Sequence, residues 1–581
     1  MLRLDDSHGR LLAAVLVFAP LAGAHAATFS VGATTDAACT HHSLASAVTA
    51  AGANGPAMDT IRVAGNLAHV EIALAVLDQS LTLAGGYANC VDTGATGRTV
   101  LSGSATLDHP VLRTGGTEGV NFLVLENLDL VGAQDSRFGG SLRLAGNQYV
   151  TLRNTRLRGG HAERGGAVYI DAYTSGAVDL FLEDGSRIED NVATYAGGGI
   201  YCRGSASVTL DDAILTANVA EHHGEVAPES GSGGGAALYD GCRLRQNIGS
   251  TSGNVAEQDG GAYYLRNDAE LALIGNGTHA AQLIGNSAEN GGAIAIEDAS
   301  GQPSSTVDIR NARINGNTAG YQGGAIALLS GGELEMRRTL RGVACHSPVY
   351  CSDLSFNEAP GSRAGTIFVG HDATAAISGT WIEGSIGYVG SVAWLQGNGV
   401  AVFDSDVIRE ASGAVALFQV SNLAEGSLDL AWSTITGNTF ANEAADRIIS
   451  ASGTGDIRLY GLVLGQHLLH ALSHDPGIVV RSDCVARDPY MLPLGEGAEF
   501  TRQLELEAPY GLAVDGRLAG GDALPADYCD ASLAPRLWGD IDGDSEVHDA
   551  ATGNVFGIHD LGADEYQAVD LIFADGFETA D

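Results

Sequence analysis

The sequence predicts an all-β solenoid, a single-stranded parallel β-helix with a short helical N-terminal cap and an irregular C-terminal segment. The main observation is a Gly-Gly block, followed by aliphatic and aromatic residues, that begins at residues 139, 165, 197, 234, 260, 291 and 323. These blocks lie 26 to 37 residues apart, a spacing typical of stacked structural repeats. No long helical pattern lies between them that could supply crossover helices.

A second motif, an apolar residue followed by two variable positions and an asparagine, precedes most blocks. After each block, small or polar residues alternate with large apolar ones, as in strands with one buried face. Glycine permits positive φ and close backbone approach at a corner, whereas asparagine tolerates left-handed backbone and can form hydrogen-bonded ladders between stacked turns. The residues expected to shape the turns are Gly165, Gly166, Gly197, Gly198, Gly234, Gly235, Gly260, Gly261, Gly291, Gly292, Gly323, Gly324, Asn191, Asn218, Asn254, Asn286, Asn317 and Asn357.

These paired motifs resemble the repeats of polymorphic outer membrane proteins, which are surface-exposed β-helical proteins of bacteria. The resemblance covers roughly residues 139–418, with Leu or Ile where that family prefers Phe. It implies a right-handed β-helix at the cell surface. Members of the family end in a transmembrane autotransporter barrel, and we expect none here because the alternating strands that it needs do not follow Gly461.

Both ends of the chain carry patterns of exported proteins. Residues 1–26 read as a secretory signal, with an apolar stretch at 11–23 and a small-x-small cleavage site at 24–26. Residues 558–567 and 572–578 resemble the choice-of-anchor tails of exported bacterial β-helix proteins, which implies retention at the surface. The expected divisions are 27–115 for the cap and first coils, 116–480 for the repeats, 481–567 for a C-terminal cap segment and 568–581 for a tail.

Composition agrees with an exported protein. Eight cysteines fit an oxidising compartment, and their order suggests the bridges Cys39–Cys90, Cys202–Cys242, Cys345–Cys351 and Cys484–Cys529. The net charge of −40, from 70 acidic and 30 basic residues, argues against nucleic acid or anionic lipid as a partner. No apolar stretch of the mature chain reaches the roughly 20 residues of a transmembrane helix, and we expect an elongated monomer.

Few side chains suggest a bound ion or cofactor. Asp540, Asp542, Asp544 and Glu546 alternate as ligands of a calcium loop would, although Ser545 stands where such a loop has glycine. His222 and His223 offer a weaker transition-metal site, since adjacent residues on a strand point apart. Calcium is therefore the one cofactor that the sequence suggests.

The sequence favours a cell-surface or secreted adhesion module without catalysis, located at the outer membrane surface or outside the cell, with a glycan or another cell-surface molecule as its ligand. The alternative is a polysaccharide lyase or glycoside hydrolase of the parallel β-helix type. Such enzymes need carboxylates at matched separation, or a base beside calcium-holding acids. The one adjacent acid pair in the coils, Asp211 and Asp212, would point to opposite faces of a strand. A site assembled from several turns would escape linear motifs.

Overall fold

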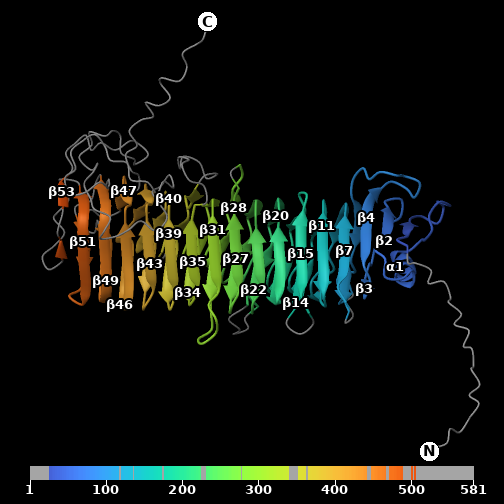
Figure 1. Ribbon diagram of the computed structural model, residues 1–581, viewed down its shortest axis with the longest axis horizontal. Helices are drawn as coiled ribbons and strands as arrows, with labels where there is room; N and C mark the ends of the chain where they lie inside the picture. Colours follow the sequence, from blue (N-terminus) through green and yellow to red (C-terminus); the bar gives the residue numbers. More distant parts are fainter. Residues whose placement is uncertain are drawn as a thin grey trace, which may run out of the picture.

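The computed structural model describes residues 25–487, except 107, 117–118, 135, 173–175, 224–229, 277, 339–350, 362–363, 441–446 and 466–469, together with 499–500 and 503–505. It is a parallel β-solenoid of about 14 turns, with 58% of residues in strands and 2% in helix. The predicted all-β parallel β-helix is therefore confirmed. Figure 1 shows the turns stacked along the long axis of the molecule, with the single helix at the N-terminal end.

A complete turn has four faces, and the same four recur along the solenoid. In one such turn, β14 (Val168–Ala172) follows the glycine pair on face 1, and β15 (Val178–Glu183) forms face 2. Face 3 is β16 (Arg187–Glu189), and face 4 is β17 (Val192–Ala196), after which β18 (Ile200–Gly204) begins the next turn directly above β14. Faces 1 to 3 join into one 42-stranded sheet, and face 4 is an 11-stranded sheet, counted over the described residues.

The remaining strands repeat this order. Those of face 1 are β3 (Leu74–Leu77), β6 (Leu112–Gly115), β10 (Leu142–Leu144), β22 (Ala236–Tyr239), β26 (Tyr263–Arg266), β30 (Ile294–Glu297), β34 (Ile326–Ser330), β38 (Ile367–His371), β42 (Gly390–Gln396) and β50 (His470–His474). Those of face 2 are β1 (Thr28–Val31), β2 (Asp59–Ala64), β4 (Leu81–Tyr87), β7 (Asn121–Glu126), β11 (Gln148–Arg153), β19 (Ala206–Leu210), β23 (Arg243–Gln246), β27 (Glu270–Ile274), β31 (Thr306–Arg310), β35 (Glu333–Arg337), β39 (Thr374–Ser378), β43 (Val400–Asp404) and β52 (Glu499–Phe500).

Face 3 contains β5 (Thr99–Ser102), β8 (Leu128–Val131), β12 (Arg156–Arg158), β20 (Ala213–Thr216), β24 (Gly249–Ser252), β28 (Ala281–Ile284), β32 (Ala312–Asn315), β36 (Ser352–Asp353), β40 (Thr380–Glu383), β44 (Val407–Arg409), β47 (Thr434–Thr436) and β53 (Gln503–Glu505). Face 4 contains β9 (Ser136–Phe138), β13 (His161–Arg164), β21 (Val219–Ala220), β25 (Val255–Ala256), β29 (Ser287–Asn290), β33 (Thr318–Gln322), β37 (Glu358–Ala359), β41 (Ile386–Gly387), β45 (Ser412–Gly413) and β48 (Thr439–Phe440). Three long strands, β46 (Ala416–Ala431), β49 (Arg447–Gly465) and β51 (Ile478–Arg487), run across more than one face.

One continuous hydrophobic core fills the solenoid from Val31 to Val485. Alternate residues of each strand point inward and stack on their equivalents in the next turn, as Leu180 does on Val208. Each fully buried aliphatic side chain contributes about 1.5–3 kcal/mol relative to an exposed one. Stacking therefore buries enough apolar surface to stabilise the fold, which no single short strand could do alone.

The predicted helical cap is present as α1 (Leu44–Ala53). Its four buried residues, Leu44, Ala47, Val48 and Ala51, belong to the main core, and the helix contacts β1, β2 and β3. The hydroxyl of Ser43 caps the helix by accepting a hydrogen bond from the N–H of Ser46 at 3.2 Å. The helix therefore covers the first turn, whose interior would otherwise face water.

A ladder of buried asparagines closes consecutive turns between faces 3 and 4. The N–H and the Nδ2 of Asn286 both donate to Oδ1 of Asn317, at 2.9 and 3.0 Å. The same Nδ2 donates to the carbonyl of Thr251 in the preceding turn at 3.0 Å. The members of the ladder, all fully buried, are Asn191, Asn218, Asn254, Asn286, Asn317 and Asn357.

The left-handed residue at this corner is not the asparagine, as expected from the sequence, but the residue before it. Glycine precedes three of the six ladder asparagines, for example Gly285 with φ +62°. Other turns force Asp190, Ala217 or Phe356 into the same conformation, with φ between 53° and 56°. The side-chain amide of each asparagine inside the ladder thereby forms hydrogen bonds with the asparagines of the preceding and following turns.

The two glycines of each block have different roles. The first adopts positive φ, as Gly291 does at +61°, whereas a Cβ on the second, Gly292, would lie 2.2 Å from the carbonyl oxygen of Gly324. In the turn of β22 these roles fall to Gly233 (φ +70°) and Gly234, one position earlier than the predicted pair. Three consecutive glycines occur there, and only the backbone conformation distinguishes them.

The predicted divisions fall within the solenoid. Pairing of β4 with β7 and of β5 with β8 crosses the boundary after residue 115. The boundary after residue 480 lies inside β51, which pairs further with β52 and β53. The described turns from β1 to β53 are therefore one structural unit.

Replacing Asn286 by Ala should lower the free energy of unfolding by roughly 2–5 kcal/mol, because the buried N–H of Asn254 loses its acceptor. Asn315→Ala is the matched control, since Asn315 lies on the outer side of β32 in the turn that follows. Denaturant unfolding measures both changes. A loss below about 1 kcal/mol for Asn286→Ala would show that the ladder is dispensable.

The second glycine tolerates no Cβ, so Gly292→Val should cost about 3 kcal/mol or more, or prevent folding. Gly97→Val should cost less than about 0.5 kcal/mol, because nothing lies within 4 Å of a Cβ at that position. Thermal midpoints of the two variants give the comparison, and similar midpoints would contradict the close approach of successive turns.

Candidate functional site

The corner between faces 4 and 1 holds a column of tyrosines on the outside of the solenoid wall. Tyr169, Tyr201 and Tyr239 follow one another on successive turns with ring centroids 5.4 and 5.0 Å apart, and Tyr264 follows at 5.7 Å. Their alternation places them outside the main core, yet all four are buried. Face 4 covers this column through Tyr195 and Phe138, so the tyrosines form a second, smaller core.

Polar residues continue the same corner beyond the tyrosines. Asp259 directly precedes the glycine pair of its turn and is 8% exposed. Its Oδ1 accepts a hydrogen bond from Nδ2 of Asn290, the equivalent residue of the next turn, at 2.8 Å. Ser232 lies one turn before Asp259 and Gln322 lies one turn after Asn290, and both are also buried.

Glu297 lies beside this polar row at the end of β30. The hydroxyl of Tyr264 donates to its Oε2 at 2.8 Å, and the guanidinium of Arg266 lies 3.5 Å from the same oxygen. The Glu297 side chain is 31% exposed and that of Arg266 is 16% exposed. The charge of Glu297 also acts on Asp259, and that of Asp259 on Tyr264, so these residues of two consecutive turns form one group. It is called here the corner cluster: Asp259, Asn290, Tyr264, Arg266 and Glu297.

The two carboxyl groups of the corner cluster have unlike surroundings. Burial raises the pKa of Asp259 to about 7, and the charges of Glu297 and Glu289 act in the same direction, against the hydrogen bond from Asn290. Glu297 instead faces a guanidinium. Such a difference between two neighbouring carboxyl groups is a common basis of acid–base assignments.

A second notable surface lies on face 2. Phe122 and Tyr149 occupy equivalent outward positions of β7 and β11, and their rings stack at 5.4 Å between centroids with an interplanar angle of 20°. They are 48% and 41% exposed, unlike the buried tyrosine column. The next residue of this outward row is Asp179, which accepts a hydrogen bond from Tyr149.

A pocket of about 290 Å³ lies near the N-terminal cap, lined in part by His69, Arg98, Thr99 and Val100. The Nε2 of His69 is 3.0 Å from the carbonyl of Ala64, and burial lowers the pKa of His69. Arg98 donates from Nε to the carbonyl of Asn154 at 2.7 Å. Both polar groups at the pocket are therefore engaged within the protein, His69 locally and Arg98 with a residue two turns further along.

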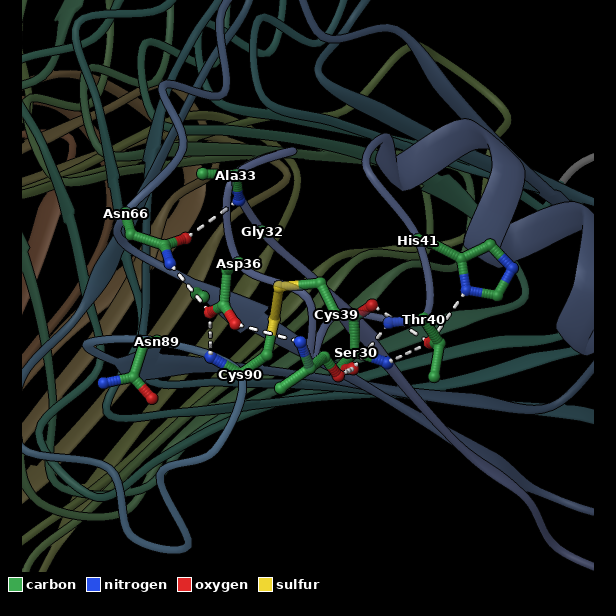
Figure 2. Close-up of a disulfide and its surroundings, with 12 residues drawn as sticks. Ser30, Gly32, Ala33, Asp36, Cys39, Thr40, His41, Asn66, Asn89 and Cys90 are labelled. Atoms are coloured by element: carbon green, nitrogen blue, oxygen red, sulfur yellow. Dashed lines mark hydrogen bonds between the residues drawn. A yellow bond between two sulfur atoms is a disulfide. The ribbon is translucent and has the colours of Figure 1, made fainter.

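Figure 2 shows the disulfide of the cap, between Cys39 and Cys90, with an S–S distance of 2.02 Å. Asp36 accepts hydrogen bonds from the N–H groups of Cys90 and Ala38, which lower the pKa of Asp36. Asp36, Cys39 and Cys90 form the one close group of three potential metal ligands that the described residues contain. Because both sulfur atoms are bonded to each other, this group is a structural bridge and not a metal site.

The other predicted site residues are placed as follows. Cys202 and Cys242 form the second predicted bridge, with Cα atoms 6.0 Å apart. Cys351 and Cys484 are also disulfide-bonded, whereas their predicted partners Cys345 and Cys529 lie outside the described residues. The predicted calcium ligands, Asp540, Asp542, Asp544 and Glu546, lie outside them as well.

The paired histidines of the inserted loop do not converge. The Nδ1 of His222 donates to the carbonyl of Ser230, whereas Nε2 of His223 lies 3.1 Å from Glu221. Asp211 and Asp212 are both exposed at the corner after β19, and neither lies within a strand. Their arrangement at a corner, with φ +51° at Asp212, replaces the strand alternation expected from the sequence.

Sequence reasoning missed both the corner cluster and the exposed aromatic pair. Asp259 and Asn290 stand at the first position of their repeat blocks, where the other repeats vary, and that variation was the available signal. Phe122 alternates with the inward Leu123 and Leu125, so its outward direction could be predicted from the pattern. Glu297 gives no linear signal of its own.

Neither a protein-family model, nor a curated protein, nor a solved structure matches this chain. Among the residues described, no helix has the length and apolar character needed to cross a membrane.

Asp259→Asn should become more stable relative to the wild type as pH rises from about 4 to 7. The folded wild type keeps its Asp259 proton up to pH about 7, whereas the unfolded chain loses it near the ordinary value of 3.8. The stability that this proton supplies is complete below pH 3.8 and is lost by pH 7, a change of up to about 4 kcal/mol. Asparagine does not titrate, so the variant should escape this loss.

The measurement is denaturant unfolding of both proteins at pH values between 4 and 8. A constant difference between the two free energies of unfolding would show that Asp259 titrates normally in the folded protein.

Proposed function

We propose that this protein is an exported β-solenoid that binds neutral glycans at the cell surface or in the medium, as an adhesion module. The observation that carries the proposal is the stacked, exposed pair of Phe122 and Tyr149 on face 2. Large aromatic rings exposed side by side on a flat sheet are unusual outside interaction surfaces. The parts of the two rings that they leave uncovered suit the apolar faces of sugar rings, and the hydroxyl of Tyr149 adds a polar edge.

The rest of the same outward row supplies hydrogen-bonding groups for sugar hydroxyls. From Tyr149 it continues through Asp179, Ser207, Arg243 and Glu270, one residue per turn. Such a row offers many weak contacts along an extended ligand. A net charge of −40 disfavours polyanionic glycans, so the preferred ligand is neutral.

Export is supported by the cysteines and by the termini. The bridges Cys39–Cys90 and Cys202–Cys242 are typical of oxidising compartments. The signal pattern at 1–26, the resemblance of the repeats to polymorphic outer membrane proteins and the resemblance of the tail to choice-of-anchor tails point the same way. We further propose calcium at Asp540, Asp542, Asp544 and Glu546.

Binding of the purified mature protein to immobilised neutral polysaccharides tests the proposal. The affinity of the double variant Phe122→Ala/Tyr149→Ala should fall at least about tenfold, since each ring-stacking contact is worth about 0.5–1.5 kcal/mol. Val479→Ala is the matched control, because Val479 is similarly exposed in the same outward row at the other end of the solenoid. Equal binding by the double variant and the control would refute the role of the aromatic pair.

Mass spectrometry of the protein recovered from a Gram-negative host tests export separately. The expected product begins at Ala27 and lies outside the cytoplasm with its disulfides formed. Recovery of an unprocessed, cytoplasmic chain would contradict the export proposal without bearing on glycan binding.

A further inference from the structure

We propose that the corner cluster hydrolyses a glycosidic bond, with Asp259 as general acid and Glu297 as general base. The cluster lies at the corner of faces 4 and 1, in the turns of β26 and β30, away from the aromatic pair on face 2. This activity therefore goes beyond the proposed binding function and does not depend on Phe122 or Tyr149.

The two carboxyl groups come from consecutive turns and are held in different ways. Asp259 is buried, and its Oδ1 accepts a hydrogen bond from Nδ2 of Asn290. That hydrogen bond does not involve Oδ2. Glu297 is fixed by the hydroxyl of Tyr264 and the guanidinium of Arg266. Glycoside hydrolysis uses one carboxylic acid and one carboxylate on either side of the scissile bond, and these two side chains supply that pair of groups from adjacent turns.

Unfilled hydrogen-bonding capacity beside Asp259 points to a ligand. The Oγ of Ser232 is fully buried and has no hydrogen-bond partner among the described residues, and the same holds for the buried Oδ1 of Asn290. Equivalent positions of a parallel ladder point the same way, so Ser232 and Asn290 flank Asp259 on its two sides. Buried polar atoms without partners are uncommon and call for an explanation, which sugar hydroxyls would supply.

The outer edge of the cluster is partly exposed to solvent. Glu297 retains 31% of its side-chain exposure, and Glu289 on the neighbouring strand of face 4 is exposed. Tyr321, one turn further, is 39% exposed and directly precedes Gln322, the residue paired with Asn290. A half-exposed ring beside the carboxyl pair offers a surface on which a sugar ring can stack.

The reaction needs water as its only co-reactant. Asp259 gives its proton to the glycosidic oxygen as the bond from the anomeric carbon to that oxygen breaks, and the bonding pair leaves with the oxygen. Water forms the new bond to the anomeric carbon and gives a proton to Glu297. Transfer of that proton to solvent and uptake of another by Asp259 restore the starting state.

The experiment uses the purified mature protein with neutral β-glucan, xylan and mannan, and with their p-nitrophenyl glycosides. The wild type should release reducing ends or nitrophenol, and its rate should fall as pH rises through about 7. Asp259→Asn and Glu297→Gln should each lose activity roughly 100-fold or more. Asp259→Asn retains an acceptor for Asn290, so its circular dichroism and thermal midpoint should show an intact fold.

Asp171→Asn is the matched control and should keep full activity. Like Glu297, Asp171 accepts a hydrogen bond from a tyrosine, Tyr169, and pairs with an arginine, Arg203. It has no acidic neighbour equivalent to Asp259, because Arg164 and Ala196 precede the glycine pairs of its own turn and of the next turn. Absence of released products with the wild type, or full activity of Asp259→Asn, would overturn the proposal. Unsaturated ends released from a polyuronate would overturn it in favour of a lyase.

The outcomes remain distinct from those of the binding experiment. Asp259→Asn should still bind polysaccharide through face 2, and Phe122→Ala/Tyr149→Ala should still cleave the small nitrophenyl glycosides. Loss of one property without the other therefore identifies which of the two assignments fails.

Discussion

The asparagine ladder is the interaction on which the regularity of this solenoid depends. At each corner that the ladder occupies the chain bends from face 3 to face 4, and its buried N–H and carbonyl groups must find partners away from water. Each asparagine inside the ladder receives two hydrogen bonds from the preceding one and donates to the following one. The side chain of Asn286 thereby satisfies an N–H and a carbonyl of the preceding turn and is linked to the side chain of the following one. Where the ladder begins, the N–H of Gly160 takes the place of an asparagine and donates to Oδ1 of Asn191 at 2.9 Å.

Stacking in register imposes a second constraint, because equivalent side chains of successive turns lie only about 4.8 Å apart. Identical charges at that distance repel, and this chain carries far more acid than base. Its arginines are therefore placed next to acids of adjacent turns, as Arg158 is beside Asp129 and Arg409 is beside Glu383. Exposed pairs add little stability individually, but here they replace a repulsion that stacking would otherwise create.

The sequence predicts the repeated features of this fold well, because every copy gives independent evidence for them. The glycine blocks, the asparagines, the cap helix and two disulfides all follow from local patterns. Face 4 cannot be predicted in this way, because strands such as Val219–Ala220 are too short to show an alternation of apolar and polar residues. The same face explains why Tyr201, outward by alternation, is nonetheless buried, a result that depends on a neighbouring strand rather than on its own.

The corner cluster illustrates why sites in a solenoid escape sequence motifs. Glycines and asparagines at the corners are fixed by backbone geometry, whereas the position before the glycine pair is free to vary, and it is Arg164, Ala196, Ser232, Asp259, Asn290 or Gln322 in successive turns. Face 4 nevertheless buries that position in four of these turns and partly buries it in the other two, so an acidic residue placed there, such as Asp259, is desolvated and its pKa is raised. A chemically distinctive group can therefore be introduced at this corner without disturbing the ladder or the core. Its partner, Glu297, comes from the next turn, and the spacing between them follows from the stacking of turns rather than from any spacing along the chain.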